Sequence, residues 1–145
     1  MEFAGEADEL AHELDQRLRT LARIVRHQVD YGLSLTSATV LARLHDGGPQ
    51  RITDLAALEL VAQPTMTALV GRLEARGLVE RRRGDADRRV VTVALTDTGR
   101  RKLAELRDAR TRFLAGHMAG LSGDERAQLA AALPLLDQII ESTTT

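Results

Sequence analysis

The sequence predicts a mainly α-helical fold that carries one small β-hairpin, and three observations support this prediction. Leucine and valine recur at spacings of three and four residues through most of the chain, which is the period of an amphipathic helix. Only residues 78–83 and 90–95 contain the alternating or β-branched runs that are typical of paired strands. The length of 145 residues, with 43% hydrophobic but only 2% aromatic side chains, suits a single domain with an aliphatic core.

A long helix is expected first, over about residues 6–30. Its apolar stripe advances by four, four, three and four residues and consists of Leu10, Leu14, Leu18, Leu21 and Val25. Acidic residues crowd the start of this segment and basic residues its end, an order that matches the helix dipole. Because the stripe is longer than one small domain needs, we expect it to pack against a second copy of the chain as well.

A shorter helix is expected next, over about residues 37–45, with Thr36 as its N-cap. Its inward positions are Val40, Leu41 and Leu44. The helix ends at Gly47-Gly48-Pro49, because glycine and proline interrupt a regular helix. The chain is then free to turn into the next pair of helices.

Two helices separated by a turn are expected over residues 52–77. Thr53 is the expected cap of the first, whose inward residues are Leu55, Ala56 and Leu58. The second begins near Pro64, a residue tolerated only in a first turn, and ends at Gly77. Its apolar stripe consists of Met66, Leu69, Val70 and Leu73. The other face is small, uncharged or basic, and consists of Pro64, Thr65, Thr67, Ala68, Gly71, Arg72 and Ala75. Such a face suits the major groove of DNA, where small side chains permit close approach to the bases.

The hairpin has a long charged loop, Gly84-Asp85-Ala86-Asp87-Arg88-Arg89, between its two strands. In the second strand Val91, Val93 and Leu95 share one face, which we expect to be buried. The adjacent arginines Arg88 and Arg89 suit the narrow, electronegative minor groove of DNA. A structural alternative is that these two arginines form salt bridges with Asp85 and Asp87.

Two further helices are expected after the hairpin. Thr96 or Asp97 caps the first, which runs to about Met118 and has inward residues that include Leu103, Leu106, Phe113 and Leu114. Ser122 and Glu125 form a capping box at the start of the last helix, which ends near Ser142. The stripe of that helix consists of Leu129, Leu133, Leu136 and Ile140. Pro134 lies inside it, so a kink or a break is expected there.

Helix, turn, helix and basic hairpin in this order form a winged helix-turn-helix, predicted here over about residues 36–96. The helices over about residues 6–30 and 97–142 are its expected dimerisation helices, within one domain of residues 1–145. A two-fold dimer presents two recognition helices to half-sites roughly 34 Å apart on double-stranded DNA, so a pseudo-palindromic operator is expected. The expected DNA-binding residues are Gln63, Pro64, Thr65, Thr67, Ala68, Arg72, Arg81, Arg82, Arg83, Asp87, Arg88, Arg89 and Arg100.

The charge distribution supports DNA as the partner, although the formal net charge of the chain is only −1. Residues 1–16 contain six acidic residues and no Lys or Arg, whereas residues 72–102 contain ten basic and five acidic residues. The local excess of positive charge in residues 72–102 matters more than the net charge of the whole chain, because attraction to phosphate acts over a Debye length of roughly 10 Å. The alternative function is a winged-helix protein-interaction module without specific DNA binding, and the basic wing argues against it.

Two segments, QPTMTALVGRLEARGLVERR and DADRRVVTVALTDTGRR, resemble the recognition helix and wing of the MarR family of bacterial transcription regulators. The second segment contains that family's Asp-x-Arg wing motif, followed by Leu-Thr and a later Gly: Asp87, Arg89, Leu95, Thr96 and Gly99. Two positions depart from the usual pattern. Leu60 stands where many helix-turn-helix sequences have a turn glycine, and Ala62 where a capping Ser or Thr is common, which indicates a weaker helix start.

The resemblance implies a homodimeric, sequence-specific regulator of transcription, most simply a repressor that a small-molecule effector releases from DNA. MarR-like proteins often bind small aromatic or anionic molecules between the dimerisation helices and the DNA-binding lobe. The candidate effector contacts lie near the junction between the first and second predicted helices. They are Arg23, His27 and Tyr31.

Several other classes of function lack support in the sequence. There is no cysteine, which excludes disulfides and a thiol switch, and the histidines show no metal-ligand spacing. No phosphate-binding loop, nucleophile elbow or dinucleotide fingerprint occurs, so neither an enzyme nor a cofactor or metal site is expected. No apolar stretch is long enough to span a membrane and no signal peptide is recognised, so we expect a cytoplasmic protein.

Overall fold

The computed structural model describes residues 2–84 and 86–143, and this part of the chain forms six helices and three strands. The helices are α1 (Glu2–Gln28), α2 (Leu35–Gly47), α3 (Ile52–Leu58), α4 (Gln63–Ala75), α5 (Asp97–Met118) and α6 (Gly123–Ser142). The strands are β1 (Gln50–Arg51), β2 (Val79–Arg83) and β3 (Val91–Leu95). The predicted fold class, a mainly helical winged helix-turn-helix, is confirmed.

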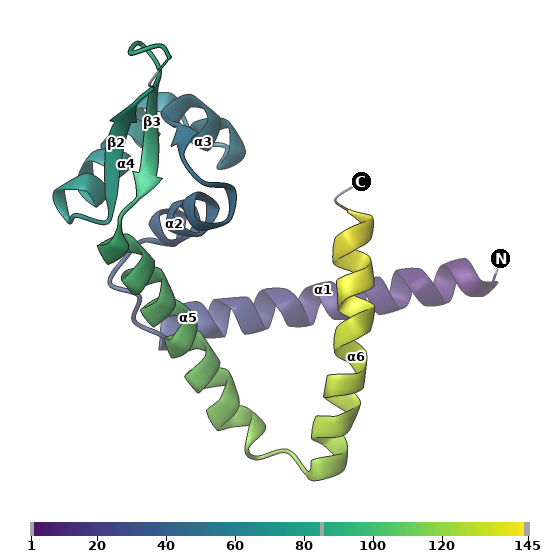
Figure 1. Cartoon of the computed structure of the whole chain (residues 1–145). Coiled ribbons are helices and arrows are strands. Elements are labelled where there is room, and N and C mark those ends of the chain that lie inside the picture. Colours follow the sequence, from purple (N-terminus) through teal and green to yellow (C-terminus); the bar gives the residue numbers. More distant parts are fainter. Residues whose placement is uncertain (1, 85, 144–145) are drawn as a thin grey trace. The chain divides into compact units, whose positions relative to one another are not determined.

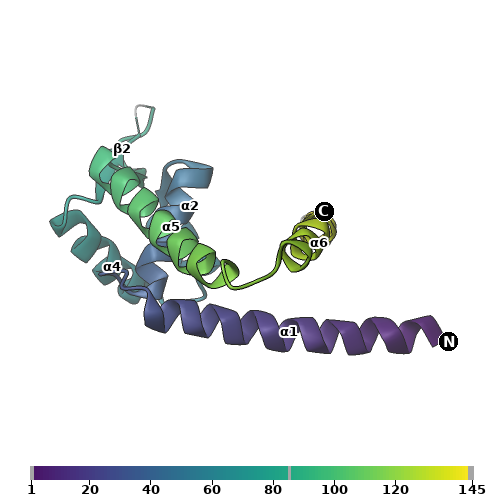
Figure 2. The same ribbon diagram turned by 90° about the horizontal axis from the view of Figure 1, so that it is seen from below.

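The chain forms two compact units, Met1–Ala109 and Arg110–Thr145. The first contains α1 to α4, the sheet and the first part of α5, and the second contains the rest of α5 and α6. Within the first unit, α2, α3, α4 and the sheet form one lobe, and the loop between β2 and β3 protrudes from it (Figures 1 and 2). This lobe is the winged helix-turn-helix.

The core of the lobe is aliphatic, as the composition predicts. The four-residue stripe of α4 is buried to 4% exposure or less, and it packs with buried residues of α2, α3, β2 and β3. The largest fully buried side chains are Leu41, Leu55, Met66, Leu73, Val40, Val70, Val79 and Val93. Each such side chain contributes roughly 1.5–3 kcal/mol to stability through burial of apolar surface. The inward faces predicted for α2 and α4 are confirmed.

The sheet has three strands and not the two expected from the hairpin. β3 lies in the centre, antiparallel to β1 and to β2, and Thr92 pairs with Arg51 on one side and with Arg82 on the other. β1 has only two residues, too few for alternation to reveal it in the sequence. The expectation for Val91 was also wrong, because this residue pairs with Arg83 next to the loop and is 38% exposed.

Two predicted helix caps were also wrong. Ser34 caps α2, and not Thr36, because the Ser34 hydroxyl accepts a hydrogen bond from the Ser37 amide at 3.2 Å. Thr53 lies inside α3, whose N-cap is Arg51 without a side-chain hydrogen bond. The extended backbone of β1 already has the geometry of an N-cap residue at Arg51, so the helix begins directly after the strand.

The turn between α3 and α4 carries the two departures from the usual helix-turn-helix pattern. Leu60 has a φ of 54°, which is the left-handed region that glycine adopts more easily than leucine. Its side chain is 93% exposed and so gains no burial in return. Ala62 is the N-cap of α4 and makes no side-chain cap bond, so this helix starts without the bond that a capping Ser or Thr would supply.

The variant Leu60→Gly is therefore expected to stabilise the protein by about 1 kcal/mol, because it relieves left-handed strain at no cost in packing. Urea unfolding monitored by circular dichroism measures this change as a higher midpoint. The matched control is Ala57→Gly, which places a glycine inside α3 at an exposed position and should destabilise by roughly 1 kcal/mol. A loss of stability in Leu60→Gly would show that the leucine stabilises the turn.

In the second unit, α6 begins with the predicted capping box. The Ser122 hydroxyl accepts from the Glu125 amide, and the Ser122 amide donates to the Glu125 carboxylate at 2.7 Å. The bond from the Ser122 amide is the main reason that the pKa of Glu125 lies below its ordinary value. Both bonds of the cap are therefore present at neutral pH, and acid that protonates the Glu125 carboxylate weakens the bond from the Ser122 amide but not the bond to the Ser122 hydroxyl. The helix continues through Pro134, so the break that was one of two expectations there does not occur.

Candidate nucleic-acid interface

The outward face of α4 presents the side chains predicted to approach DNA. Gln63, Pro64, Thr65, Thr67, Ala68 and Arg72 are all exposed, in contrast to the buried stripe on the opposite side of the same helix. The Thr67 hydroxyl donates to the Gln63 carbonyl at 2.9 Å, which leaves its oxygen lone pairs directed to solvent as acceptors. The first turn of α4 contains no acidic residue, so nothing there repels phosphate.

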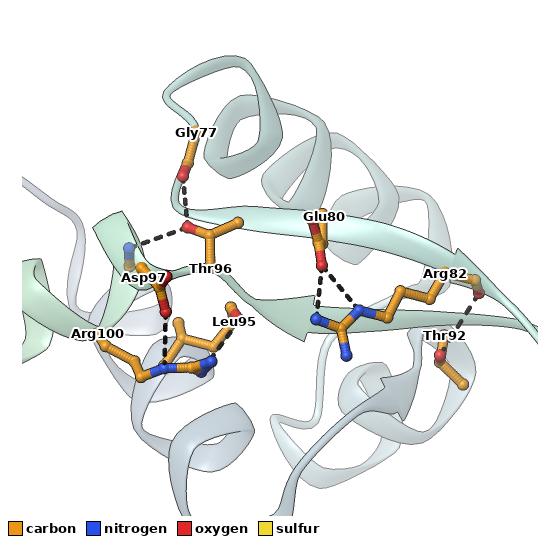
Figure 3. Close-up of polar contacts among 9 residues, drawn as sticks. Gly77, Glu80, Arg82, Thr92, Leu95, Thr96, Asp97 and Arg100 are labelled. Carbon is orange, nitrogen blue, oxygen red and sulfur yellow. Dashed lines mark hydrogen bonds and ion pairs between the residues drawn. The ribbon is translucent and has the colours of Figure 1, made fainter.

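Residues of the Leu-Thr-x-x-Gly motif join the hairpin to the helices on either side (Figure 3). The Thr96 hydroxyl donates to the Gly77 carbonyl at 2.6 Å and accepts from the Gly99 amide at 3.0 Å. The Thr96 amide donates to the Leu78 carbonyl at 3.1 Å. Thr96, one of the two predicted caps, therefore caps α5 and also holds this helix against the connection between α4 and β2. The motif therefore joins the end of α4, the hairpin and the start of α5.

At the wing tip, Asp87 organises the backbone. Its carboxylate accepts from the Arg89 amide at 2.9 Å, and its carbonyl accepts from the Val90 amide at 3.0 Å. A carboxylate cannot attract phosphate, so the position of Asp87 suits shaping of the turn from which Arg88 and Arg89 project. Within residues 2–84 and 86–143, neither arginine has an ion-pair partner. Asp85, the other carboxylate of the structural alternative, lies outside these ranges.

The other arginines predicted to contact DNA differ in whether they already form ion pairs within the protein. Arg81 forms a long ion pair with Glu74, 3.7 Å between Nε and Oε2, and Arg82 pairs with Glu80 at 2.6 Å. Arg100 lies 3.5 Å from Asp97 and donates to the Leu95 carbonyl at 3.3 Å (Figure 3). Arg72 and Arg83 are exposed and, within the described residues, have no ion-pair partner. Among the five arginines Arg72, Arg81, Arg82, Arg83 and Arg100, these two are the most available for phosphate.

The candidate effector residues lie near the connection between α1 and α2. His27 and Tyr31 line one hollow of ≈ 470 Å³, together with other residues of the 26–35 segment. Arg23 does not line this hollow and is exposed one helical turn earlier on α1. The structure therefore brings two of the three candidates together.

Sequence reasoning missed one part of this surface. A groove between the start of α4 and the base of the wing is lined by Gln63 and Arg89, which were predicted, and by Arg51 and Thr53, which were not. The only signal in the sequence was a lone basic residue before a helix, and such residues are common on any surface. The pairing of β1 with β3 is what brings Arg51 beside the wing.

No group of three histidine, aspartate or glutamate side chains in the described part of the chain is arranged to hold a metal ion. Among the same residues, no helix is both long enough and apolar enough to cross a membrane.

Comparison with known proteins places this arrangement in a family. A profile of the MarR family matches residues 33–91. The HTH-type transcriptional repressor MdtR of Bacillus subtilis is 27% identical over 141 residues, which cover 94% of this chain and 91% of MdtR. The HTH-type transcriptional regulator YwoH of the same species is 31% identical over 105 residues, 72% of this chain and 76% of YwoH. The crystal structure of transcriptional regulator Tm0710 from Thermotoga maritima matches with a TM-score of 0.78 and 26% identity, over 91% of this chain and 96% of Tm0710. With its winged helix-turn-helix and its wing motif, the chain belongs to the MarR family of transcriptional regulators, which bind DNA and are not enzymes.

Proposed function

We propose that this chain is a homodimeric repressor that binds a pseudo-palindromic operator through α4 and the wing. The observation that carries the proposal is the pairing of two features on one lobe. The outward face of α4 is exposed and carries basic but no acidic residues at its centre, and Arg88 and Arg89 project from the wing without an ion-pair partner among the described residues.

Each group of side chains has a distinct role in the proposed complex. Gln63, Thr65 and Thr67 approach base edges in the major groove, where amide and hydroxyl groups hydrogen-bond to bases. Pro64 and Ala68 are small and allow α4 to lie close to the duplex. Arg72 and Arg83 bind phosphates, whereas Arg81, Arg82 and Arg100 steer through their charge unless they leave their present partners. Arg88 or Arg89 enters the minor groove.

The proposed dimer rests on the apolar side chains that both ends of the chain expose. Leu10, Leu18, Leu21 and Ile24 of α1 are between 41% and 70% exposed. Leu129, Leu133, Leu135, Ile139 and Ile140 of α6 are between 41% and 62% exposed. So many large apolar side chains on two helices are unfavourable in water, and a second copy related by a two-fold axis would cover them.

The double variant Leu133→Glu with Ile140→Glu tests the dimer. Both side chains lie on one face of α6, seven residues apart, and each is present twice in a two-fold dimer. Because burying each side chain contributes roughly 1.5–3 kcal/mol, the dissociation constant of the dimer should rise by more than about 10³-fold. Sedimentation equilibrium measures the change. The control, Gln128→Glu with Gln138→Glu, adds the same charge to α6 at exposed polar positions and should remain dimeric. Monomers in both variants would indicate repulsion between charges instead.

The proposed direction of control is repression. The relative MdtR is described as a repressor, and a bound dimer on promoter DNA excludes polymerase by occupancy alone. A small aromatic or anionic effector that binds the hollow lined by His27 and Tyr31 would release the protein, with Arg23 contributing positive charge from one helical turn away.

A reporter gene placed behind the DNA upstream of this protein's own gene tests the proposal. Expression of the wild-type chain should lower reporter output, and the variant Arg88→Ala with Arg89→Ala should restore it. An increase in output with the wild type would contradict repression. If neither protein changes the output and the wild type also fails to bind the fragment in vitro, the protein-interaction module becomes the better account.

A further inference from the structure

The groove between the start of α4 and the base of the wing has a volume of ≈ 330 Å³ and two kinds of lining. Ile52, Val90 and Val91 give it an apolar part, and Arg51, Thr53, Gln63 and Arg89 give it a polar and cationic part. None of these seven residues is acidic. The groove therefore combines an apolar surface with two positive charges, which is the complement of an anionic chain with apolar segments.

The exposure of the lining residues shows that the protein itself leaves the groove open. Arg51, Thr53, Gln63 and Arg89 are exposed, and Val91 is 38% exposed although it belongs to the face of β3 that also carries the buried Val93. Within the described residues the Arg51 side chain has no ion-pair partner, and it makes no cap bond to α3. Two arginines without ion-pair partners among the described residues therefore flank an exposed apolar side chain, and their charges are available to an anion that enters the groove.

The shape of a duplex indicates what would occupy the groove. In B-DNA a single sugar-phosphate strand separates the major groove from the neighbouring minor groove. If α4 lies in the major groove and the wing in the adjacent minor groove, as proposed above, this strand must pass between them. The groove of Arg51, Gln63 and Arg89 lies between these two elements.

We propose that this groove seats the sugar-phosphate strand, and that Arg51 is a further DNA-positioning residue of this protein. A phosphate lies between Arg51 on the β1 side and Arg89 on the wing side, and the neighbouring deoxyribose packs on Val91 and Ile52. Arg51 lies on β1, which pairs with the central strand β3, so its backbone is fixed relative to the wing. Contact with this phosphate sets how deeply and at which register α4 enters the major groove.

This inference rests on the proposed DNA-binding function and adds a specific consequence. A phosphate contact carries no sequence information, so loss of Arg51 should weaken binding to every duplex by the same factor. A residue that reads bases, such as Gln63, should instead change the preference among sequences. The two effects can be separated on one pair of duplexes.

The first test uses Arg51→Gln, Arg51→Lys and the control Arg19→Gln, which removes one exposed positive charge from α1. Binding is measured by fluorescence anisotropy with a labelled duplex recovered from a random pool by the wild-type protein, and with a scrambled duplex, at several salt concentrations. Arg51→Gln should weaken binding to both duplexes roughly tenfold and reduce the slope of log affinity against log salt by about one. Arg51→Lys should keep the slope, and Arg19→Gln should bind like the wild type.

The second test locates the phosphate. Duplexes in which one phosphate at a time is replaced by an uncharged methylphosphonate are titrated with wild type and with Arg51→Gln. At one phosphate per half-site, the replacement should weaken the wild type but leave Arg51→Gln unaffected, because the contact is already absent. This coupling would not occur if Arg51 acted only through the stability of β1.

The outcomes separate the inference from the proposed function. If the wild type binds no duplex, the proposed function and this inference both fail. If the wild type binds and Arg51→Gln retains its affinity and salt slope, only the inference is overturned. If Arg51→Gln loses affinity but couples to no single phosphate, the residue acts on the fold and the assignment of this groove to the DNA strand is wrong.

Discussion

The double variant Arg88→Ala with Arg89→Ala is expected to weaken specific DNA binding by at least about a hundredfold, with the fold and the dimer unchanged. A hydrogen bond to a charged group contributes roughly 1.5–3 kcal/mol, so two such contacts account for a loss of this size. Both side chains are exposed, and within the described residues neither forms an ion pair that the substitution would break. The loss should therefore appear in binding and not in stability.

Fluorescence anisotropy on the selected duplex measures this effect, and thermal unfolding checks the fold. The matched control is Arg17→Ala with Arg19→Ala, which removes the same charge from exposed positions of α1. An equal loss of affinity in the control would mean that total charge, and not the wing, determines binding. Dissociation of the wing variant into monomers would show that the two arginines are structural.

The substitution Gly99→Ala is expected to destabilise the protein by about 3 kcal/mol or more, because a side chain at this position has no space. An added Cβ would lie 2.0 Å from the Leu78 carbonyl oxygen and 2.7 Å from Cδ1 of Leu95. The nearest atom belongs to the backbone at the connection between α4 and β2, so relief requires movement of α5 away from the hairpin. That movement would also break the bond between the Thr96 hydroxyl and the Gly77 carbonyl.

Urea unfolding of Gly99→Ala against Gly116→Ala tests this account. Gly116 lies on the same helix, and a Cβ there would meet nothing within 4 Å. Alanine at this position should stabilise by up to about 1 kcal/mol through helix propensity. If both variants have the same midpoint, the close approach of α5 to Leu78 does not constrain the fold. If Gly99→Ala folds normally yet binds DNA weakly, the contact between α5 and Leu78 controls only the angle between α4 and the wing.

The helices and the buried faces of α2 and α4 could be predicted from the sequence because they depend on local periodicity, whereas Leu58 of α3, predicted to face inward, is 50% exposed at the end of its helix. The stripe of α4, from Met66 to Leu73, is buried as its spacing indicates, and Gly77 adopts a positive φ of 71° just after the helix. The winged helix-turn-helix follows from the order of these elements. The sequence also located the wing motif, since the Asp-x-Arg and Leu-Thr-x-x-Gly residues are consecutive or nearly so.

What could not be predicted depends on contacts between segments far apart in the chain. β1 exists only because Gln50 and Arg51 pair with β3, and two residues carry no periodic signal. Ser34 and Thr36 are both good capping residues, so the sequence does not decide which one caps α2. The burial of Val91 depended on how far the core extends along β3, which alternation does not show. The ion pair between Arg81 of β2 and Glu74 of α4 likewise depends on how two different elements lie against each other.

Selection of DNA from a random pool by the purified protein, followed by sequencing, tests the central claim most directly. Two copies of α4 and the wing should enrich two inverted half-sites whose centres lie about 10 base pairs, or roughly 34 Å, apart. The enriched duplex should bind at least about 10³-fold more tightly than a scrambled duplex at physiological salt. Absence of enrichment would contradict a sequence-specific regulator, and enrichment of a single half-site without an inverted partner would contradict the two-fold dimer.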